Sequence, residues 1–391
     1  MHKYANVSAA VPAQKTMPIT VDIQKKLQSL NLQIKWSSSA RRIAILGASG
    51  AGKSMTLKMI AGIETPDRGK IIADGRTLFD SDRKINMRTQ ERGTGYLFQN
   101  YALFPNMTVE QNIGIACRAA RSERAALVQN LICRFGLKGL EHRHPDSLSG
   151  GQQQRAALAR ILAAAPDMIL LDEPFSALDS SLRDKMQLEL EKNLADFPGT
   201  VILVTHSRDE AYRFAQETVI LENGHVAAAG PTKEVFRHPH TAAAARITGC
   251  KNIARAQRQD DFTVAVPEWG VLLHSDEKLP QHFEAVGYRA HDFAPVWDEL
   301  PIEMRRDCIS YNEDARAELQ FEKIFYFYPD TAAAVGPAQG KARPAARALL
   351  TWMLQREDWP LLAEKGMPRY LRLDVSKALF LREEDGERNE P

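Results

Sequence analysis

The sequence lacks any apolar run long enough to cross a bilayer, and it has few cysteines. A membrane-spanning helix needs about 18 consecutive apolar residues, which no stretch of this 391-residue chain approaches. Any membrane role is therefore expected to be indirect. The four cysteines show no metal-ligand spacing, which is typical of reduced thiols in the cytosol: Cys117, Cys133, Cys250 and Cys308.

The N-terminus also lacks the apolar core of a secretory signal. Residues 1–16 are polar and rich in alanine, so we expect them to form a disordered tail. Met17 would serve as a start as well as Met1 does, and the sequence leaves that choice open.

A strong excess of charge of either sign is absent as well. The chain has 51 Lys and Arg against 49 Asp and Glu, for a net charge of +2. This balance disfavours nucleic acid as a main partner. With 44% hydrophobic residues, the composition is that of a soluble globular protein, and the length suits two domains.

The most informative pattern that is present is G-x-x-x-x-G-K-[ST] at residues 47–54. A strand-like run, 43–46, precedes it, and a helix-like run, 55–60, follows it. Glycines let the backbone wrap around a phosphate, and the N-terminus of the helix favours negative charge. Lys53 can reach the terminal phosphates, and the Ser54 hydroxyl can bind Mg²⁺. The pattern predicts a nucleoside triphosphate site built from Gly47, Ala48, Ser49, Gly50, Ala51, Gly52, Lys53, Ser54 and Met55.

Two further apolar runs end in polar residues. Residues 168–171 lead into Asp172 and Glu173, and residues 201–205 lead into His206. Continuous hydrophobicity is typical of strands covered on both faces, so residues 18–240 are predicted to form an α/β core with a mainly parallel sheet. Ligands bind beyond the carboxyl ends of such strands, so the polar ends should converge on one site. Asp172 suits Mg²⁺, and Glu173 can orient or deprotonate an attacking water.

Beyond residue 250 the pattern changes to short strands without helical connections, which predicts a small β-rich domain over residues 250–391. We expect residues 331–348, rich in Ala, Gly and Pro, to form a flexible loop, and residues 383–391 to be frayed. The expected strands are Phe262–Val266, Trp269–Leu273, Val286–Arg289, Phe321–Tyr328 and Tyr370–Leu373.

A third motif, Leu-Ser-Gly-Gly-Gln-Gln-Gln-Arg at residues 148–155, opens a helix. Together with the P-loop it resembles the ATP-binding-cassette (ABC) ATPases. Gln99, the run Ser176–Asp179 and His206 extend the resemblance in the family's order and spacing across about residues 18–240. The resemblance implies a P-loop ABC ATPase domain at residues 17–245 with a helical subdomain at about 100–165. It also implies a C-terminal accessory domain of the oligomer-binding (TOBE-like) type.

The resemblance implies a shared mechanism in which two such chains pack head to tail. ATP and Mg²⁺ would lie between the P-loop of one chain and Ser149, Gly150 and Gly151 of the other, with Asp179 at the interface. His206 would stabilise the γ-phosphate and position Glu173. Gln99 would contact the metal or the water and link the site to a membrane partner. A chain with one copy of each element is therefore expected to form a homodimer.

The block at residues 95–109 and the β-rich extension resemble bacterial importer ATPases, and the wider pattern resembles molybdate and sulfate importers. The implied function is ATP hydrolysis that drives uptake of an oxyanion, first molybdate, with sulfate, tungstate or another solute as alternatives. The implied partners are membrane permease subunits and a substrate-binding protein, at the cytoplasmic face of the membrane. A non-transport role in translation or DNA repair is a further alternative, although two cassettes or a long coiled coil would then be expected.

Two features depart from the family or stay open. The stretch that should carry an adenine-stacking aromatic, residues 28–32, has none, and Trp36 after it is either a core residue or a substitute; Tyr4 lies before it. In the C-terminal domain, Arg289 and His291 form a cationic pair that could bind a regulatory oxyanion or serve structure alone.

Overall fold

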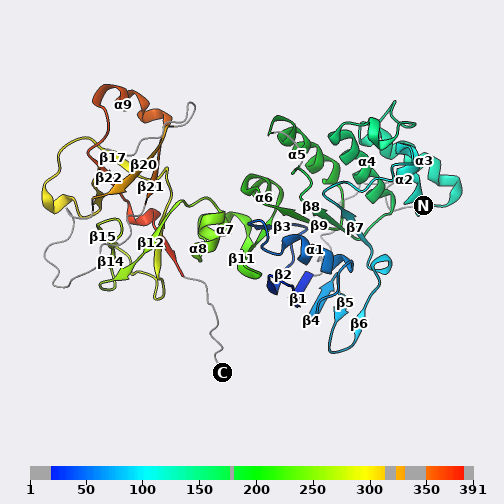
Figure 1. The fold of residues 1–391 in the computed structure, drawn as a ribbon, viewed down its shortest axis with the longest axis horizontal. Coiled ribbons are helices and arrows are strands. Elements are labelled where there is room, and N and C mark those ends of the chain that lie inside the picture. The colour runs from blue at the N-terminus through cyan, green and yellow to red at the C-terminus, as the bar shows by residue number, and fades with distance from the viewer. Residues whose placement is uncertain (1–18, 177–179, 313–322, 331–348, 383–391) are drawn as a thin grey trace, which may run out of the picture. The chain divides into compact units, whose positions relative to one another are not determined.

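The computed structural model describes residues 19–176, 180–312, 323–330 and 349–382, which fall into two compact units, residues 1–233 and 234–391 (Figure 1). The predicted tail at 1–16, the loop 331–348 and the end 383–391 lie outside the described residues, as does Asp179. In the described part of the chain, no helix combines the length and apolarity needed to span a membrane.

The first unit is built on one eleven-stranded sheet in the order β6-β5-β4-β1-β2-β11-β10-β3-β9-β8-β7. The strands are β1 (Ile19–Lys26), β2 (Asn31–Ser38), β3 (Arg42–Gly47), β4 (Arg68–Ala73), β5 (Arg76–Asp80), β6 (Ile85–Asn86), β7 (Thr94–Leu97), β8 (Met168–Asp172), β9 (Thr200–Thr205), β10 (Glu217–Glu222) and β11 (His225–Pro231).

The prediction of a mainly parallel sheet is wrong for the sheet as a whole. Strands β10, β3, β9, β8 and β7 are mutually parallel, but β6, β5, β4, β1 and β2 pair antiparallel. Tight turns join several of the antiparallel pairs, and such turns cannot connect parallel neighbours. Side chains of β2 also alternate between exposed and buried along its whole length, as in a sheet with one face in solvent.

The parallel half matches the sequence prediction and positions the site. Every residue of β8 and β9 is buried, and so are five of the six in β3. The three strands lie side by side in the order β3-β9-β8, so their carboxyl ends meet at one edge. A tight hairpin turn joins β10 to β11, with Asn223 and Gly224 both at positive φ.

Helices complete the first unit. The predicted helical subdomain is present as α2, α3 and α4, which pack on one another beside β7 (Figure 1). The helices of this unit are α1 (Lys53–Ala61), α2 (Val109–Ile115), α3 (Arg121–Arg134), α4 (Gly150–Ala163), α5 (Ser180–Leu194) and α6 (Arg208–Phe214), and α7 (Thr232–Arg237) crosses into the second unit. The expected end of the first domain, residue 245, falls inside α8 (Ala242–Ile247), and this helix packs on strands of the second unit.

The second unit contains four three-stranded sheets, in the orders β12-β16-β23, β13-β14-β15, β17-β22-β18 and β19-β20-β21. Its core includes the fully buried Trp269, Tyr288 and Trp352. The strands are β12 (Asn252–Arg255), β13 (Gln257–Arg258), β14 (Thr263–Val266), β15 (Val271–His274), β16 (Ala285–Tyr288), β17 (Ala294–Val296), β18 (Cys308–Ile309), β19 (Tyr311–Asn312), β20 (Lys323–Pro329), β21 (Leu350–Leu354), β22 (Tyr370–Arg372) and β23 (Leu379–Leu381).

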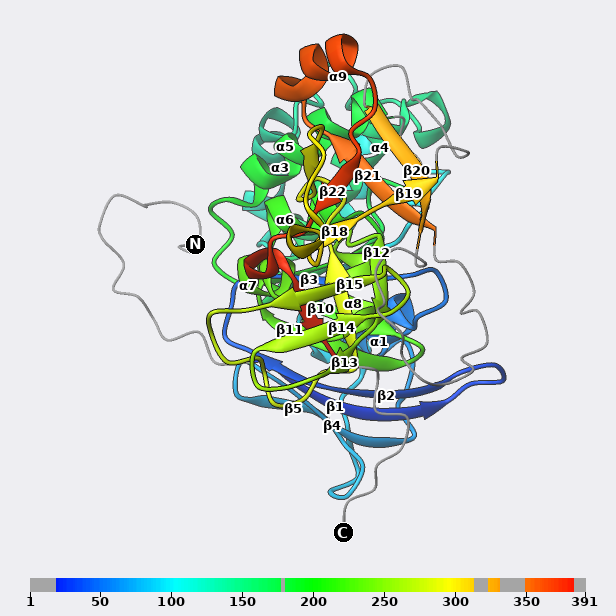
Figure 2. The same ribbon diagram turned by 90° about the vertical axis from the view of Figure 1, so that its left-hand side faces the viewer.

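The β-rich character of this unit is confirmed, but the expectation of no helical connection is wrong. Along the chain, helix α9 (Trp359–Lys365) follows β21 and precedes β22 (Figure 2). Pro360 occupies its first turn, where proline is tolerated because no intrahelical donor is needed there.

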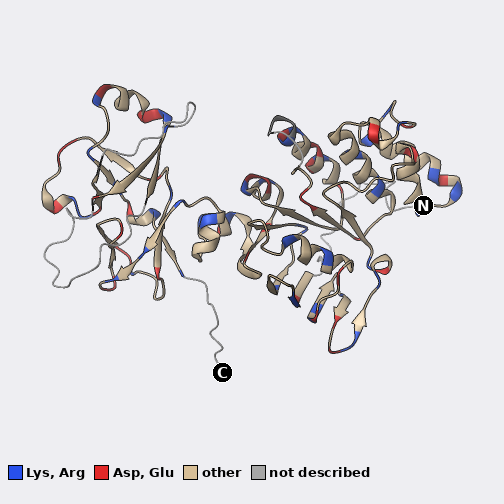
Figure 3. Cartoon of the chain, viewed as in Figure 1, with Lys and Arg blue, Asp and Glu red and all other residues tan. Residues whose placement is uncertain are grey.

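The distribution of charged residues and the state of the cysteines match what the sequence predicts for both units. Basic and acidic residues are interspersed along the ribbon of each unit (Figure 3). All four cysteines are free, and burial raises the pKa of the Cys250 and Cys308 thiols to about 11, so the neutral thiol is favoured over the thiolate at neutral pH.

Candidate functional site

The P-loop joins β3 to α1 and adopts the tight path that its glycines predict. Gly50 and Gly52 have φ of 82° and 99°, in the left-handed region that favours glycine. A Cβ on Gly47 would lie 2.3 Å from the carbonyl oxygen of Leu221, so only glycine fits there without a shift. The Lys53 Nζ donates to the carbonyl oxygen of Ala48 across the loop at 2.8 Å. The lysine ammonium is thus folded over the loop, where a phosphate would sit.

Burial lowers the pKa of Lys53, and the carboxylates of Glu173 and Asp172 partly offset this. The Lys53 Nζ lies 3.8 Å from Glu173 Oε1. A cation taken out of water in this way is stabilised by nearby negative charge, which is what a phosphate group supplies.

Asp172 ends β8 with both carboxylate oxygens bonded. The Ser54 hydroxyl donates to Oδ1 at 2.7 Å, and the Tyr96 hydroxyl donates to Oδ2 at 2.8 Å. Hydroxyl and carboxylate oxygens are the ligands that Mg²⁺ prefers, so Ser54 and Asp172 fit that ion. The described residues hold no group of three or more His, Cys, Asp or Glu suited to a metal. A cation here would therefore need phosphate and water oxygens to complete its coordination, as Mg²⁺ usually does.

Glu173 is held in a strained backbone conformation next to Asp172. Its φ is 44°, a region that non-glycine residues rarely adopt, and its N–H donates to the carbonyl oxygen of Val204 on β9 at 3.0 Å. Its second carboxylate oxygen lies 3.3 Å from the Nδ1 of His206, whose side chain is half exposed. The carboxylate therefore points into the space between Lys53 and His206.

Gln99 reaches this group through a serine. Its Nε2 donates to Ser176 Oγ at 3.1 Å, and Ser176 Oγ donates to the carbonyl oxygen of Glu173 at 3.0 Å. The described structure thus links Gln99 to the backbone of Glu173, while its predicted contact with the metal stays a prediction.

The segment Ser149–Gly151 lies at the start of α4 and, among the described residues, is not bonded to the P-loop of the same chain. Ser149 caps the helix by accepting from the N–H of Gln152, whose side chain accepts from the N–H of Ser149. Ser149 and Gly150 are exposed. Within residues 19–176, no hydrogen bond or ion pair joins this segment to the P-loop. One chain therefore assembles Lys53, Ser54, Gln99, Asp172, Glu173 and His206, but not the Ser-Gly-Gly segment.

Sequence reasoning missed two side chains that hold this site. Tyr96 lies in the block at residues 95–109 but carries no site motif, and its hydrogen bond to Asp172 joins residues 76 positions apart in the sequence. Glu210, on α6, is buried and accepts from the Thr205 hydroxyl at 2.5 Å, and Thr205 Oγ1 in turn accepts from the N–H of Ser207 at 2.9 Å. Burial raises the pKa of Glu210, opposed by the Thr205 bond and by Arg183. The signal available in the sequence is its position in the first turn of the helix that follows His206.

The open questions about aromatic and cationic residues are partly answered. Trp36 is only 5% exposed and packs in the core with Leu32 and Ile34, so it does not offer a stacking face. Arg289 donates to the backbone carbonyls of Thr248 and Phe236, and His291 lies 3.7 Å from Asp292. These contacts favour the structural interpretation of that pair.

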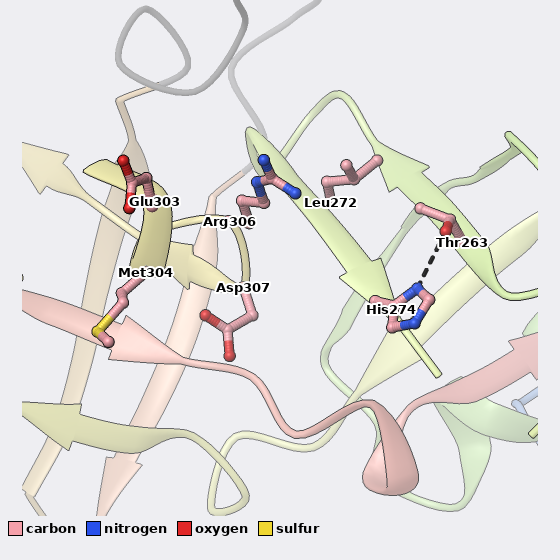
Figure 4. Close-up of a pocket in the computed structure, with 7 residues that line it drawn as sticks. All are labelled: Thr263, Leu272, His274, Glu303, Met304, Arg306 and Asp307. Carbon is pink, nitrogen blue, oxygen red and sulfur yellow. Dashed lines mark hydrogen bonds between the residues drawn. The ribbon is translucent and has the colours of Figure 1, made fainter. Parts of the chain in front are cut away.

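A separate hollow of about 300 Å³ lies in the second unit (Figure 4). The Thr263 hydroxyl and the His274 Nδ1 form a 3.2 Å hydrogen bond across part of its wall. A second hollow shares two of its residues, His274 and Asp307. The lining of the first is of mixed charge: Thr263, Leu272, His274, Glu303, Met304, Arg306 and Asp307.

The fold and this site define a P-loop nucleoside-triphosphatase core with a helical subdomain. The ABC transporter family model matches residues 27–176. A sulfate/thiosulfate import ATP-binding protein of Thermosynechococcus vestitus is 33% identical over 317 residues, covering 78% of this chain and 91% of the relative. The chain therefore belongs to the ATP-binding proteins of ABC transporters.

Other relatives align over shorter stretches of this chain. An Fe(3+) ions import ATP-binding protein of Pseudomonas fluorescens is 43% identical over 209 residues, covering 53% of this chain and 58% of the relative. A molybdenum import ATP-binding protein of Rhodospirillum rubrum is 35% identical over 222 residues, covering 56% and 60%. Among solved structures, a dimeric ATP-binding cassette bound to ADP and Pi matches 55% of this chain and 99% of its own, at 30% identity and a TM-score of 0.46.

Proposed function

We propose that this chain hydrolyses ATP to drive import of an oxyanion through a membrane permease. The observation that carries the proposal is the convergence of three strand ends: Lys53 lies 3.8 Å from Glu173, and Ser54 bonds Asp172 at 2.7 Å. This is the arrangement that a triphosphate, a cation and an attacking water require. The import ATP-binding proteins among its relatives support the coupling to transport.

In the proposed reaction the P-loop binds the phosphates with its backbone N–H groups and Lys53. Ser54 and Asp172 would hold Mg²⁺, with Gln99 as a further ligand, and the ion would supply positive charge against the phosphates. Glu173 orients the attacking water and accepts its proton, while His206 stabilises the γ-phosphate and holds Glu173. The 3.3 Å approach of His206 to Glu173 supports this pairing.

The site is completed by a second copy of the chain. Ser149 and Gly150 are exposed at the N-terminus of a 14-residue helix, where backbone N–H groups and the helix dipole favour an anion. We infer that Ser149, Gly150 and Gly151 of one copy bind the γ-phosphate held by the other, with Asp179 at the interface. The functional form is then a homodimer with two ATP sites.

The proposed partners are permease subunits and a substrate-binding protein, with this chain at the cytoplasmic face of the membrane. The sequence pattern favours molybdate. A relative that aligns over 91% of its own length is named for sulfate and thiosulfate, and others, aligned over 58% and 60%, for Fe(3+) and molybdenum. Molybdate and sulfate are both tetrahedral oxyanions, so they form the two arms of the test.

The test is deletion of the gene followed by complementation. We expect the deletion strain to lose molybdoenzyme activity at low molybdate and to recover it at high molybdate. Wild-type protein and Lys58→Ala, a change on the same helix outside the phosphate loop, should restore uptake, and Lys53→Ala should not, because it removes the charge that binds the phosphates.

Sulfur auxotrophy in place of molybdoenzyme loss would identify sulfate as the substrate and contradict molybdate. A deletion strain with neither phenotype, or rescue by Lys53→Ala, would contradict an ATP-driven oxyanion importer and return a role in translation or DNA repair to consideration.

A further inference from the structure

The hydroxyl of Tyr96 donates a hydrogen bond to Asp172, the carboxylate that would hold the metal. Tyr96, on β7, donates to Asp172 Oδ2 at 2.8 Å, and Ser54 donates to Oδ1 at 2.7 Å. Asp172 is 7% exposed, so water contributes little to holding it. A carboxylate bonded on both oxygens by fixed donors has one preferred orientation.

The strand pairing explains how Tyr96 reaches Asp172. Strands β7 and β8 are parallel, with Tyr96 opposite Leu170, two residues before Asp172. The tyrosine side chain is long enough to span that offset, and its ring packs against Phe98 with a centroid separation of 4.5 Å.

We propose that Tyr96 is a positioning residue for the magnesium site: it fixes the orientation of Asp172, so that Oδ1 stays on the side of Ser54. This inference rests on the proposed function, because it assigns Asp172 to Mg²⁺. Tyr96 acts through its hydrogen bond to Asp172.

The residues just after β7 make two other hydrogen bonds to the residues after β8. One of these bonds provides a control for the Tyr96 experiment. Gln99 bonds Ser176, and the Tyr101 hydroxyl lies 3.5 Å from the carbonyl oxygen of Pro174. Tyr101, which is buried, is a second tyrosine near β7 whose hydroxyl donates to the chain after β8, but to a backbone carbonyl in place of the carboxylate. Tyr101→Phe removes an equivalent hydroxyl without touching Asp172.

The experiment compares wild type, Tyr96→Phe and Tyr101→Phe in the full-length protein. ATP binding is measured with EDTA present, and then ATP binding and hydrolysis are measured as Mg²⁺ is titrated. For Tyr96→Phe we expect the ATP dissociation constant in EDTA to stay within about twofold of wild type. The Mg²⁺ concentration that gives half-maximal ATP binding and hydrolysis should rise about tenfold, because a hydrogen bond to a charged group contributes free energy on this scale. At saturating Mg²⁺, kcat should return to the wild-type value. Tyr101→Phe should match wild type in its Mg²⁺ requirement.

An unchanged Mg²⁺ requirement in Tyr96→Phe would overturn the inference. So would an equal shift in Tyr101→Phe, or a Tyr96→Phe protein that loses ATP affinity in EDTA, because each indicates a general packing effect. If wild-type protein shows no Mg²⁺-dependent ATP binding, the proposed function itself fails, and the two failures are thereby distinguished. Phenylalanine keeps the ring that packs on Phe98, so the variant retains that contact.

Discussion

Glu173 and Glu210 both lie near His206, but their carboxylates are in different environments. Glu173 is partly exposed and faces the cations Lys53 and His206, at 3.8 and 3.3 Å. Glu210 is buried, with the Thr205 hydroxyl at 2.5 Å and Arg183 4.0 Å away. The first carboxylate is placed to act on a ligand, whereas the second supports the backbone around His206.

The burial of Glu210 has a consequence for stability. Its pKa is raised in the folded protein, so the ionised form costs free energy at neutral pH, and this cost disappears as the pH falls through the folded-state pKa. Glu210→Gln keeps an acceptor for Thr205 and removes the charge. At pH 7 we expect the free energy of unfolding of this variant to be at least that of wild type, and to exceed it by no more than about 1 kcal/mol. The difference between the two proteins should become smaller as the pH is lowered.

Denaturant unfolding from pH 7 to pH 4.5 checks this, and Asp209→Asn provides the matched control. Asp209 is its exposed neighbour on the same helix, so that change should stay within about 0.5 kcal/mol of wild type at each pH. A Glu210→Gln protein clearly less stable than wild type at pH 7 would show that the pairing with Arg183 outweighs the burial of the charge.

At the scale of elements, the sequence predicted the parallel half of the sheet but not the antiparallel half. A buried strand that ends in a polar motif is a local signal, which is why β3, β8 and β9 and their site residues were found. The pairing of β1 with β4, or of Tyr96 with Asp172, joins segments about 50 to 76 residues apart. No local pattern specifies such partners, so these features needed the structure.

Two helices share the same capping arrangement, which separates folding from function at the Ser-Gly-Gly segment. Thr108 with Gln111 caps α2, and Ser149 with Gln152 caps α4. Thr108→Ala and Ser149→Ala should each lower the free energy of unfolding by about 1 kcal/mol. Only Ser149→Ala should also reduce ATP hydrolysis, by at least about tenfold, because its hydroxyl is proposed to contact the γ-phosphate.

Denaturant unfolding and steady-state ATPase measurements on both variants check this pair. Equal losses of hydrolysis in Thr108→Ala and Ser149→Ala would mean that Ser149 acts only as a helix cap. A Ser149→Ala protein with full ATPase activity would contradict its assignment to the nucleotide site.

At the scale of the whole molecule, the first unit carries every described residue proposed for the nucleotide site. The P-loop, Asp172, Glu173 and His206 are assembled in one chain, whereas the Ser-Gly-Gly segment makes no contact with them through hydrogen bonds or ion pairs of the described residues. A phosphate site that needs both parts therefore needs two chains. The P-loop alone is common to many nucleotide-binding proteins; because the cap of α4 is exposed, we propose that the P-loop is half of a composite site.

Glu173→Gln tests this dimer directly. The amide cannot accept the proton of the attacking water, so hydrolysis should fall at least about 10²-fold while ATP still binds. ATP bound in both sites then holds the closed form, which in wild type is released by hydrolysis. Light scattering after size-exclusion chromatography with ATP should give twice the 43.7 kDa of one chain for Glu173→Gln. Adding Lys53→Ala should return it to monomer, and a Glu173→Gln protein that stays monomeric with ATP bound would refute the composite site.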